Sequence, residues 1–399
     1  MSSEPTGGPA GRRDEQRRRV CVVITARPSY SRIKTALSAL DAHPAVDLQL
    51  VVGASALLDR YGSAVHQITA DGFTVAAEVT MVLEGENPTS MAKTTGLGVL
   101  ELATVFANLA PDVVVTVADR YETLATAVAA AYMNIPLAHV QGGEVSGSID
   151  EKVRHAITKL ADVHFPATPL AAERIIKMGE DPGTVHVTSC PSIDLAAEVA
   201  ADPALGFDPF ERYGGVGAPV DLAGGYLVVL QHPVTTEYEQ ARSHVGETLH
   251  AVAATGLPTL WFWPNVDAGS DGTSNAIRAF REIQRPDNIH FFKNFAPTDF
   301  LRLLANASVL VGNSSVGIRE CAFLGVPTVN IGSRQGGRER GPNVVDVGYD
   351  RDEIRRAIDA HRAHGPYPPD HLYGDGRAGE RIADLLATVP LSVEKRLCY

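Results

Sequence analysis

The sequence is poor in cysteine, in long apolar runs and in positive charge, and each shortage excludes a class of protein. No apolar run approaches the roughly 18–20 residues of a membrane span, and the N-terminus lacks the apolar core of a signal peptide. The four cysteines are scattered, with no C-x-x-C pair. We therefore expect a reduced, cytoplasmic protein with no membrane partner and no structural metal site.

The net charge is −12, which argues against a nucleic-acid partner, because such a partner requires a basic surface. A small anionic ligand is still allowed, since it needs only a local cluster of donors. The chain has no G-x-G-x-x-G loop, so the sequence does not support a nicotinamide cofactor.

From Val20 onward, strand-like apolar runs alternate with amphipathic helical segments, which predicts β-α-β units and a mostly parallel sheet. The predicted strands are Val20–Thr25, Leu48–Val52, Val113–Val117, Leu137–Val140, Val163–Pro166, Val185–Val187, Tyr226–Leu230, Thr259–Trp263, Ile289–Phe292, Val309–Val311 and Thr328–Ile331. The predicted helices are Tyr30–Ala42, Ser90–Leu109, Tyr121–Met133, Ile149–Ala161, Pro169–Met178, Thr236–Ala254, Asn275–Gln284, Pro297–Asn306, Gly317–Leu324 and Ala378–Ala387.

A stretch rich in glycine, proline and aspartate, Asp202–Gly225, resembles a linker between two such series. We predict an α/β fold with two Rossmann-like domains, at 19–202 and 203–375, that face each other across a cleft. Residues 1–18 are predicted to be a flexible tail. The segment 376–399 is predicted to form a final helix and tail that pack back on the first domain.

The most informative stretch is 139–155, where an apolar strand pattern ends in a loop crowded with polar side chains. Gln141, Glu144, Asp150 and His155 all lie in it. Loops that follow buried strands are where α/β enzymes place their chemistry. This stretch is therefore our first candidate for acid–base residues.

Two loops of the second half are candidates for binding phosphate. Ser314 and Ser315 follow a predicted strand and open a helix, whose free N–H groups and dipole suit an anion; Glu320 would then reach a ribose diol. An ordinary helix N-cap explains the same residues. Arg334, in a glycine-rich loop after the next strand, would pair with phosphate or base, or would simply be solvated.

Other polar residues also follow predicted strands directly: Arg27, Ser31, Asp119, Arg120, His232 and Asn265. Taken singly, each equally fits a turn, a structural histidine or a surface ion pair. Their shared position is more informative, because residues just beyond parallel strands lie at one edge of a sheet. Two facing domains with one ligand site between them form the glycosyltransferase-B arrangement, which handles nucleotide sugars.

Several spaced motifs give the chain a resemblance to the UDP-N-acetylglucosamine 2-epimerases, closest to the hydrolysing branch of sialic-acid synthesis. The resemblance covers about Val20 to Val347. The motifs are Gly-Gly-Glu-Val-Ser-Gly-Ser-Ile-Asp (142–150), Arg-His-Ala-Ile-Thr-Lys-Leu-Ala (154–161), Pro-Asn-Val-Asp-Ala-Gly-Ser (264–270), Gly-Asn-Ser-Ser-Val-Gly-Ile-Arg-Glu (312–320) and Arg-Gln-Gly-Gly-Arg-Glu (334–339).

The resemblance implies a UDP site in the second domain and sugar chemistry in the first, with no metal or other cofactor. By resemblance, the contacts to UDP would come from Arg27, Ser31, His232, Asn265, Lys293, Ser314, Ser315, Glu320 and Arg334. Asp119, Arg120, Asp150 and His155 would stand around the sugar. Elimination of UDP would give a 2-acetamidoglucal, and hydration would then give N-acetylmannosamine.

The chain departs from the family pattern at two positions. Gln141 stands where the hydrolysing branch carries a glutamate, and an amide cannot serve as a base at neutral pH. Ala56 stands where a histidine is expected. The carboxylates left for proton transfer are Asp119, Glu144, Asp150 and Glu151.

Three alternatives to the hydrolysing reaction therefore stay open. The first is a non-hydrolysing epimerase that gives UDP-N-acetylmannosamine, and the second is a divergent hydrolase or eliminase acting on a modified nucleotide sugar. The third is a UDP-sugar binding protein without catalysis. The family precedent also implies a homodimer or homotetramer. The Ala-, Gly- and Arg-rich composition is typical of a high-GC bacterium, where we expect such a gene to serve a secondary metabolite rather than sialic acid.

Overall fold

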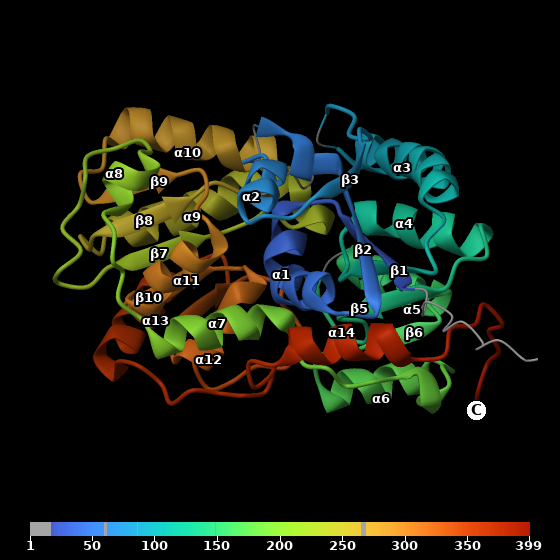
Figure 1. Ribbon diagram of the computed structural model, residues 1–399. Coiled ribbons are helices and arrows are strands. Elements are labelled where there is room, and N and C mark those ends of the chain that lie inside the picture. The colour runs from blue at the N-terminus through green and yellow to red at the C-terminus, as the bar shows by residue number, and fades with distance from the viewer. Residues whose placement is uncertain (1–16, 60–61, 86, 148, 265–268) are drawn as a thin grey trace, which may run out of the picture.

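The computed structural model describes residues 17–59, 62–85, 87–147, 149–264 and 269–399, and it contains two α/β domains that lie side by side (Figure 1). Each domain is built on a parallel six-stranded sheet, in the orders β3-β2-β1-β4-β5-β6 and β12-β11-β10-β7-β8-β9. In each sheet the first three strands extend to one side, and the chain then returns to the other side of the first strand for the remaining three. Doubly wound nucleotide-binding folds have this reversal. The predicted fold class is confirmed.

The first sheet consists of β1 (Arg18–Ile24), β2 (Val46–Gly53), β3 (Val75–Val79), β4 (Val113–Val117), β5 (Leu137–Val140) and β6 (Val163–Phe165). The second consists of β7 (Leu227–Leu230), β8 (Thr259–Phe262), β9 (Ile289–Phe292), β10 (Val309–Gly312), β11 (Thr328–Ile331) and β12 (Val344–Val347).

The helices up to the second sheet are α1 (Arg27–Ala42), α2 (Ala64–Ala70), α3 (Pro88–Leu109), α4 (Tyr121–Tyr132), α5 (Asp150–Leu160), α6 (Pro169–Lys177), α7 (Pro191–Ala201) and α8 (Pro209–Tyr213). Those that follow are α9 (Ala241–Ala253), α10 (Ser270–Gln284), α11 (Pro297–Ala305), α12 (Glu320–Leu324), α13 (Arg351–His364) and α14 (Ala378–Thr388). Short 3₁₀ helices are η1 (Ala54–Leu57), η3 (Pro182–Thr184), η4 (Thr235–Gln240) and η5 (Ser315–Gly317).

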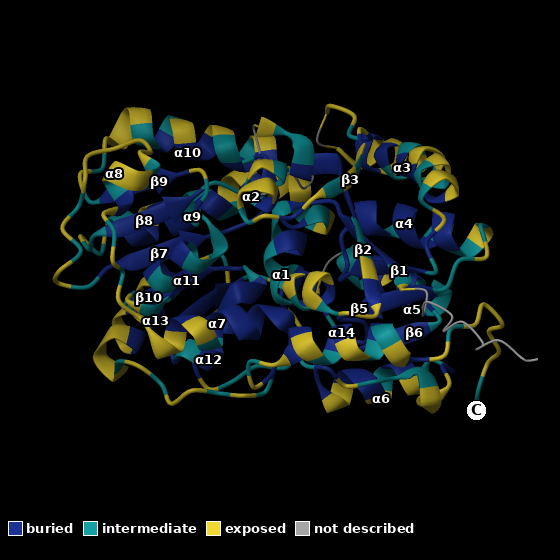
Figure 2. Cartoon of the chain, viewed as in Figure 1, coloured by how far each residue is buried: buried dark blue, intermediate teal, exposed yellow. Residues whose placement is uncertain are grey.

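The central strands are buried on both faces, because helices cover both sides of each sheet (Figure 2). This is why β4 and β10 read as predominantly apolar runs in the sequence. The same packing leaves each domain with apolar clusters on either side of its sheet. Among the described residues, no helix combines the length and apolar character that a membrane crossing requires.

Several elements differ from the sequence-based expectation. β3 and β12 were missed, because they are partly exposed edge strands and carry no continuous apolar run. α2, α7 and α13 were also missed. The predicted strand Val185–Val187 is wrong: only Val185 makes a single bridge, to His164. The predicted helix Thr236–Ala254 begins as η4, since Glu237 has non-helical dihedral angles.

The chain passes between the domains at α7 and again before α14. α14 packs along α1 of the first domain, where Ile382 and Leu386 belong to the same apolar cluster as Leu37. The first amide groups of α14 are capped by a side chain distant in sequence. Asp194 of α7 accepts hydrogen bonds from the backbone N–H groups of Ala378, at 2.9 Å, and Gly379, at 2.7 Å. One carboxylate therefore joins α7 to the start of α14.

Substituting Asp194→Ala should lower the free energy of unfolding by about 2 kcal/mol, because it leaves buried helix-terminal amides without an acceptor. Asp384→Ala, on the exposed side of α14, should change the free energy of unfolding by less than about 0.5 kcal/mol. Urea denaturation of both variants measures the difference. Equal effects would contradict the capping role.

Candidate active site

A cleft between the two domains is lined by loops from both sheets. Loops that follow β1, β4 and β5 meet loops that follow β7, β10 and β11 around a cavity of about 130 Å³. A larger cavity of about 470 Å³ adjoins it, and the two share Arg27, Pro28, Arg120 and Asn294. The carboxyl ends of both sheets thus open on one continuous space.

Most of the residues predicted for the site lie together in this cleft. The smaller cavity is lined by Arg27, Ser31, Asp119, Arg120, Asp150, His232, Ser314, Ser315, Glu320 and Arg334. Lys293 lines the larger cavity. Asn265 lies outside the described residues. Gln141, Glu144 and His155 are not among the residues that line either cavity.

Gln141 is buried, with 1% of its surface exposed, and its side chain turns away from the cleft lining. Its Nε2 donates to Cys190 Sγ at 2.7 Å. The backbone is in the left-handed region, with φ of 66°, and its N–H donates to Phe165 O at 2.9 Å. The geometry makes Gln141 part of the packing between β5, β6 and the start of α7.

Two acid–base candidates of α5 are positioned differently. His155 is half-buried, and its Nε2 lies 2.9 Å from Glu151 Oε1. Glu151 also accepts from the backbone N–H of Ser146 at 2.7 Å. Asp150 starts α5 and reaches the cavity, where Arg334 Nη2 lies 3.9 Å from its Oδ2. Asp150 is therefore the residue through which α5 meets the cleft.

Arg27 begins α1 at the boundary of the two cavities. Burial lowers the pKa of its guanidinium to about 10, and no acidic group raises it again. The group stays charged at neutral pH, and no carboxylate pairs with it among the residues that the structure describes. A half-buried cation with no carboxylate partner among the described residues attracts an anion into the cleft.

Asp119 follows β4 and lies among three guanidinium groups. Arg154 donates to its Oδ2, Arg32 Nη1 lies 3.5 Å from its Oδ1, and Arg338 Nη2 lies 3.8 Å from its Oδ2. Burial alone would raise the pKa of this carboxyl, but the three cations together hold its pKa well below the usual range. Asp119 is thus an ionised carboxylate on the cavity wall.

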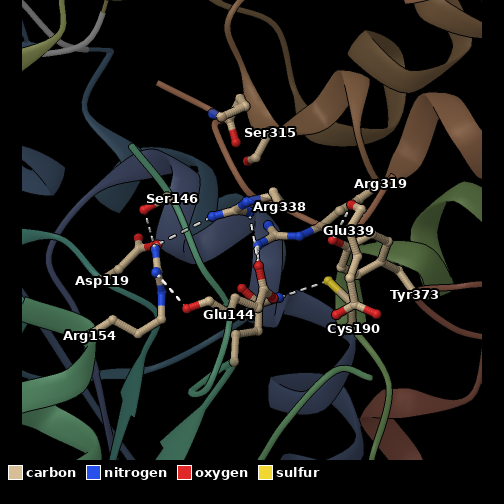
Figure 3. Close-up of polar contacts among 12 residues, drawn as sticks. Asp119, Glu144, Ser146, Arg154, Cys190, Ser315, Arg319, Arg338, Glu339 and Tyr373 are labelled. Atoms are coloured by element: carbon tan, nitrogen blue, oxygen red, sulfur yellow. Dashed lines mark hydrogen bonds and ion pairs between the residues drawn. The ribbon is translucent and has the colours of Figure 1, made fainter. Parts of the chain in front are cut away.

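Glu144 joins the two domains through a buried ion cluster (Figure 3). Its Oε2 lies 2.6 Å from Arg319 Nη2 and 2.9 Å from Arg338 Nη1, both of the second domain. Arg154 donates to its backbone oxygen at 2.9 Å. Burial would raise the pKa of Glu144, yet these guanidinium groups lower it to about 2. Glu144 is therefore an interdomain anchor.

The arginines of this cluster were not predicted as site residues. Arg154, Arg319 and Arg338 are almost fully buried, although a lone arginine in a sequence normally indicates solvent exposure. Arg154 and Arg319 directly precede predicted site residues, and Arg338 directly precedes Glu339. All three arginines lie inside the motifs quoted above. That proximity was the available signal, but the distances that bring the arginines together are created by the fold.

The second-domain loops are held by hydrogen bonds across the sheet. Asn313 Oδ1 accepts from the backbone N–H of His232 at 2.7 Å, and its Nδ2 donates to His232 O at 2.8 Å. Ser314 caps η5 through its own side chain. Arg32 of α1 donates to Ser315 Oγ at 3.0 Å. Glu320 Oε2 is buried without a hydrogen-bond partner among the described residues.

The described residues contain no group of three or more histidine, cysteine or acidic side chains arranged to hold a metal ion. The cleft instead combines guanidinium groups, helix-terminal amides, hydroxyls and carboxylates. Such a set binds a polyanion on one side and moves protons on the other.

Comparison with known proteins identifies relatives of the same length. A protein of Legionella pneumophila named "UDP-N,N'-diacetylbacillosamine 2-epimerase (hydrolyzing)" is 34% identical, over 94% of this chain and 97% of that protein. A "UDP-N-acetylglucosamine 2-epimerase" of Neisseria meningitidis is 28% identical, over 95% of this chain and 98% of that protein.

Solved structures share the fold at lower sequence identity. The UDP-GlcNAc 2-epimerase of Methanocaldococcus jannaschii, in complex with UDP-GlcNAc and UDP, matches with a TM-score of 0.76 and 16% identity, over 92% of this chain and 99% of that one. The family model described as UDP-N-acetylglucosamine 2-epimerase matches residues 38–387. Because the family model covers most of the chain and a relative is 34% identical to it, the chain belongs to the UDP-N-acetylglucosamine 2-epimerase family.

Proposed function

We propose that this protein is a hydrolysing 2-epimerase of a UDP-linked 2-acetamido sugar, which releases UDP and the free sugar inverted at C2. The observation that carries the proposal is the composition of the cleft. Two first-domain carboxylates, Asp119 and Asp150, share a cavity with the half-buried cation Arg27 and with the hydroxyls of Ser314 and Ser315. Relatives named as hydrolysing support the choice of branch.

The nucleotide side of the cleft would be built by the second domain together with Arg27. The guanidinium of Arg27 and the hydroxyls of Ser314 and Ser315 would bind the diphosphate. Glu320, whose Oε2 has no partner among the described residues, would accept hydrogen bonds from the ribose hydroxyls. A cation that meets negative charge as the C1–O bond breaks stabilises the transition state more than the ground state.

The reaction would proceed in two steps. First the C1–O bond breaks, UDP leaves with the electron pair, a carboxylate takes the C2 proton, and a C1–C2 double bond forms. Water then adds to the glucal: its hydroxyl bonds to C1, and a proton returns to C2 from the opposite face. The two faces therefore require two proton-carrying groups.

We assign these groups to Asp119 and Asp150. The three arginines keep Asp119 ionised, so it is always available to face the cationic C1 and to receive the C2 proton. Asp150 reaches the cavity from the start of α5. Gln141 takes no part in proton transfer under this assignment, because it is neutral and its amide is bound to Cys190.

The proposal predicts the products formed from UDP-GlcNAc and from UDP-N,N'-diacetylbacillosamine in D₂O. With at least one of them, proton and phosphorus NMR should detect free UDP and a free sugar inverted at C2 that carries deuterium at C2. A UDP-linked epimer would establish the non-hydrolysing reaction instead. UDP with an unhydrated glucal, or no change with either sugar, would contradict the proposal.

Matched variants connect these products to the assigned residues. Asp119→Asn and Asp150→Asn should each lower kcat by about 10²–10⁴-fold, the usual contribution of a positioned acid or base. Their UDP affinity should be retained, because the nucleotide groups are unchanged.

Arg27→Met should weaken UDP binding by about 10- to 100-fold, since it removes a charge-assisted hydrogen-bond donor worth about 1.5–3 kcal/mol. Isothermal titration calorimetry measures the change. Arg356→Met, on the exposed side of α13, should leave the affinity unaltered. A UDP affinity that does not depend on Arg27 would remove the diphosphate assignment.

Gln141→Glu restores the family's usual residue and tests whether the amide limits turnover. The new carboxylate would be buried and would lose the donor to Cys190, so we expect a lower melting temperature and a change in kcat below about threefold. Steady-state kinetics and thermal unfolding give the two readouts. A many-fold increase in kcat would return position 141 to the proton-transfer machinery.

A further inference from the structure

Arg338 belongs to the second domain, but its charged partners belong to the first. It follows β11, and its side chain is 3% exposed. Nη1 lies 2.9 Å from Glu144 Oε2, and Nη2 lies 3.8 Å from Asp119 Oδ2. Arg338 and Glu144 do not line the cavity, whereas Asp119 does. Of the two carboxylates that Arg338 pairs with, Asp119 is therefore the one that connects it to the cavity wall.

We propose that Arg338 is a positioning residue that completes the cation shell of Asp119 when the two domains meet, and that Glu144 holds it there. The inference rests on the proposed function, in which Asp119 faces the sugar. Under it, the cleft has its full set of charges only when the loop after β11 is docked on the first domain. Glu144 is then an anchor for Arg338 and not a proton carrier.

The loop that carries Arg338 is docked at points on both sides of it. On one side of Arg338, the loop approaches Gly147 so closely that a Cβ at Gly147 would lie 1.9 Å from Ser333 O. Beyond Arg338, Thr168 Oγ1 donates to Glu339 Oε2 at 2.7 Å. Thr168 and Gly147 belong to the first domain. The position of Arg338 is therefore set by the contact between the domains.

The other charged groups around Asp119 come from the first domain itself. Arg154 of α5 donates to its carboxylate, and Arg32 Nη1 of α1 lies 3.5 Å away. His139 of β5 is neutral at physiological pH, since burial lowers its pKa to about 3. Arg338 is thus the one member of the described cation shell that depends on the second domain.

Arg319 provides a matched control. It is also on the second domain, its side chain is 1% exposed, and its Nη2 lies 2.6 Å from Glu144 Oε2. It pairs with Glu144 as Arg338 does, but it is not among the groups that pair with Asp119. Removing either arginine deprives Glu144 of one partner, whereas only Arg338→Gln removes a cation from Asp119.

The first test is independent of turnover. The titration of Asp119 is followed by NMR in protein with ¹³C-labelled aspartate carboxyls, and its signal is assigned by its loss in Asp119→Asn. In Arg338→Gln the pKa of Asp119 should rise by about one unit or more, as expected for loss of a cation at this distance. In Arg319→Gln the shift should be a few tenths at most. Equal shifts, or none in Arg338→Gln, would overturn the proposal.

The second test separates positioning from a loss of fold. Asp119 stays ionised in Arg338→Gln, but its carboxylate loses a contact that holds its orientation. Arg338→Gln should therefore lower kcat at least tenfold, with the UDP dissociation constant within threefold of wild type, and Arg338→Lys should recover part of the loss. The double variant Glu144→Gln with Arg338→Gln removes the two charges of the Glu144–Arg338 pair together. The pKa of Asp119 should be raised in it as in Arg338→Gln alone. A parallel loss of kcat in Arg319→Gln and Arg338→Gln would overturn the proposal.

These tests also separate the inference from the proposed function. If the wild-type protein releases no UDP from either sugar nucleotide, the proposed function fails. The titration of Asp119 in Arg338→Gln still decides whether Arg338 positions that carboxylate.

Discussion

The buried ion cluster of Glu144 with Arg319 and Arg338 is the interaction on which the site depends. Taking a carboxylate and two guanidinium groups out of water costs several kcal/mol per ion, and only their mutual attraction offsets that cost. Glu144 comes from the first domain and the arginines from the second. Each domain therefore carries charges that are stable only against the other, and the cleft lies beside this contact.

The distribution of charge within the cleft follows from that contact. Arg338 is shared between Glu144 and Asp119, so the interdomain anchor and the cavity wall belong to one network. Arg27, at the boundary of the two cavities, has no carboxylate partner among the described residues. Arg319 and Arg338 are paired with carboxylates of the protein. The charge of Arg27 is available to a ligand. That contrast separates the arginines that hold the two domains together from the arginine that we propose binds the diphosphate.

Much of the fold followed from sequence pattern. The central strands are buried on both faces and read as apolar runs, so the α/β class and both Rossmann-like sheets were predicted. The edge strands β3 and β12 have half-exposed patterns and were missed. Gln141 was marked as a departure from the family pattern, but its hydrogen bond to Cys190 joins residues 49 positions apart, and no local pattern reports such a pair.

The sequence alone determined that polar residues stand after several of the strands, and parallel strands bring such residues to one edge of a sheet. Its motifs determined the family. Only the tertiary structure decided which of those residues reach the cavity. Asp119, Asp150 and Arg27 do, whereas Glu144, Gln141 and His155 are held in contacts away from the cavity lining. The reason is physical: carboxylates at similar places in a sequence become an interdomain anchor or part of the cavity wall according to the contacts that the opposite domain makes with them.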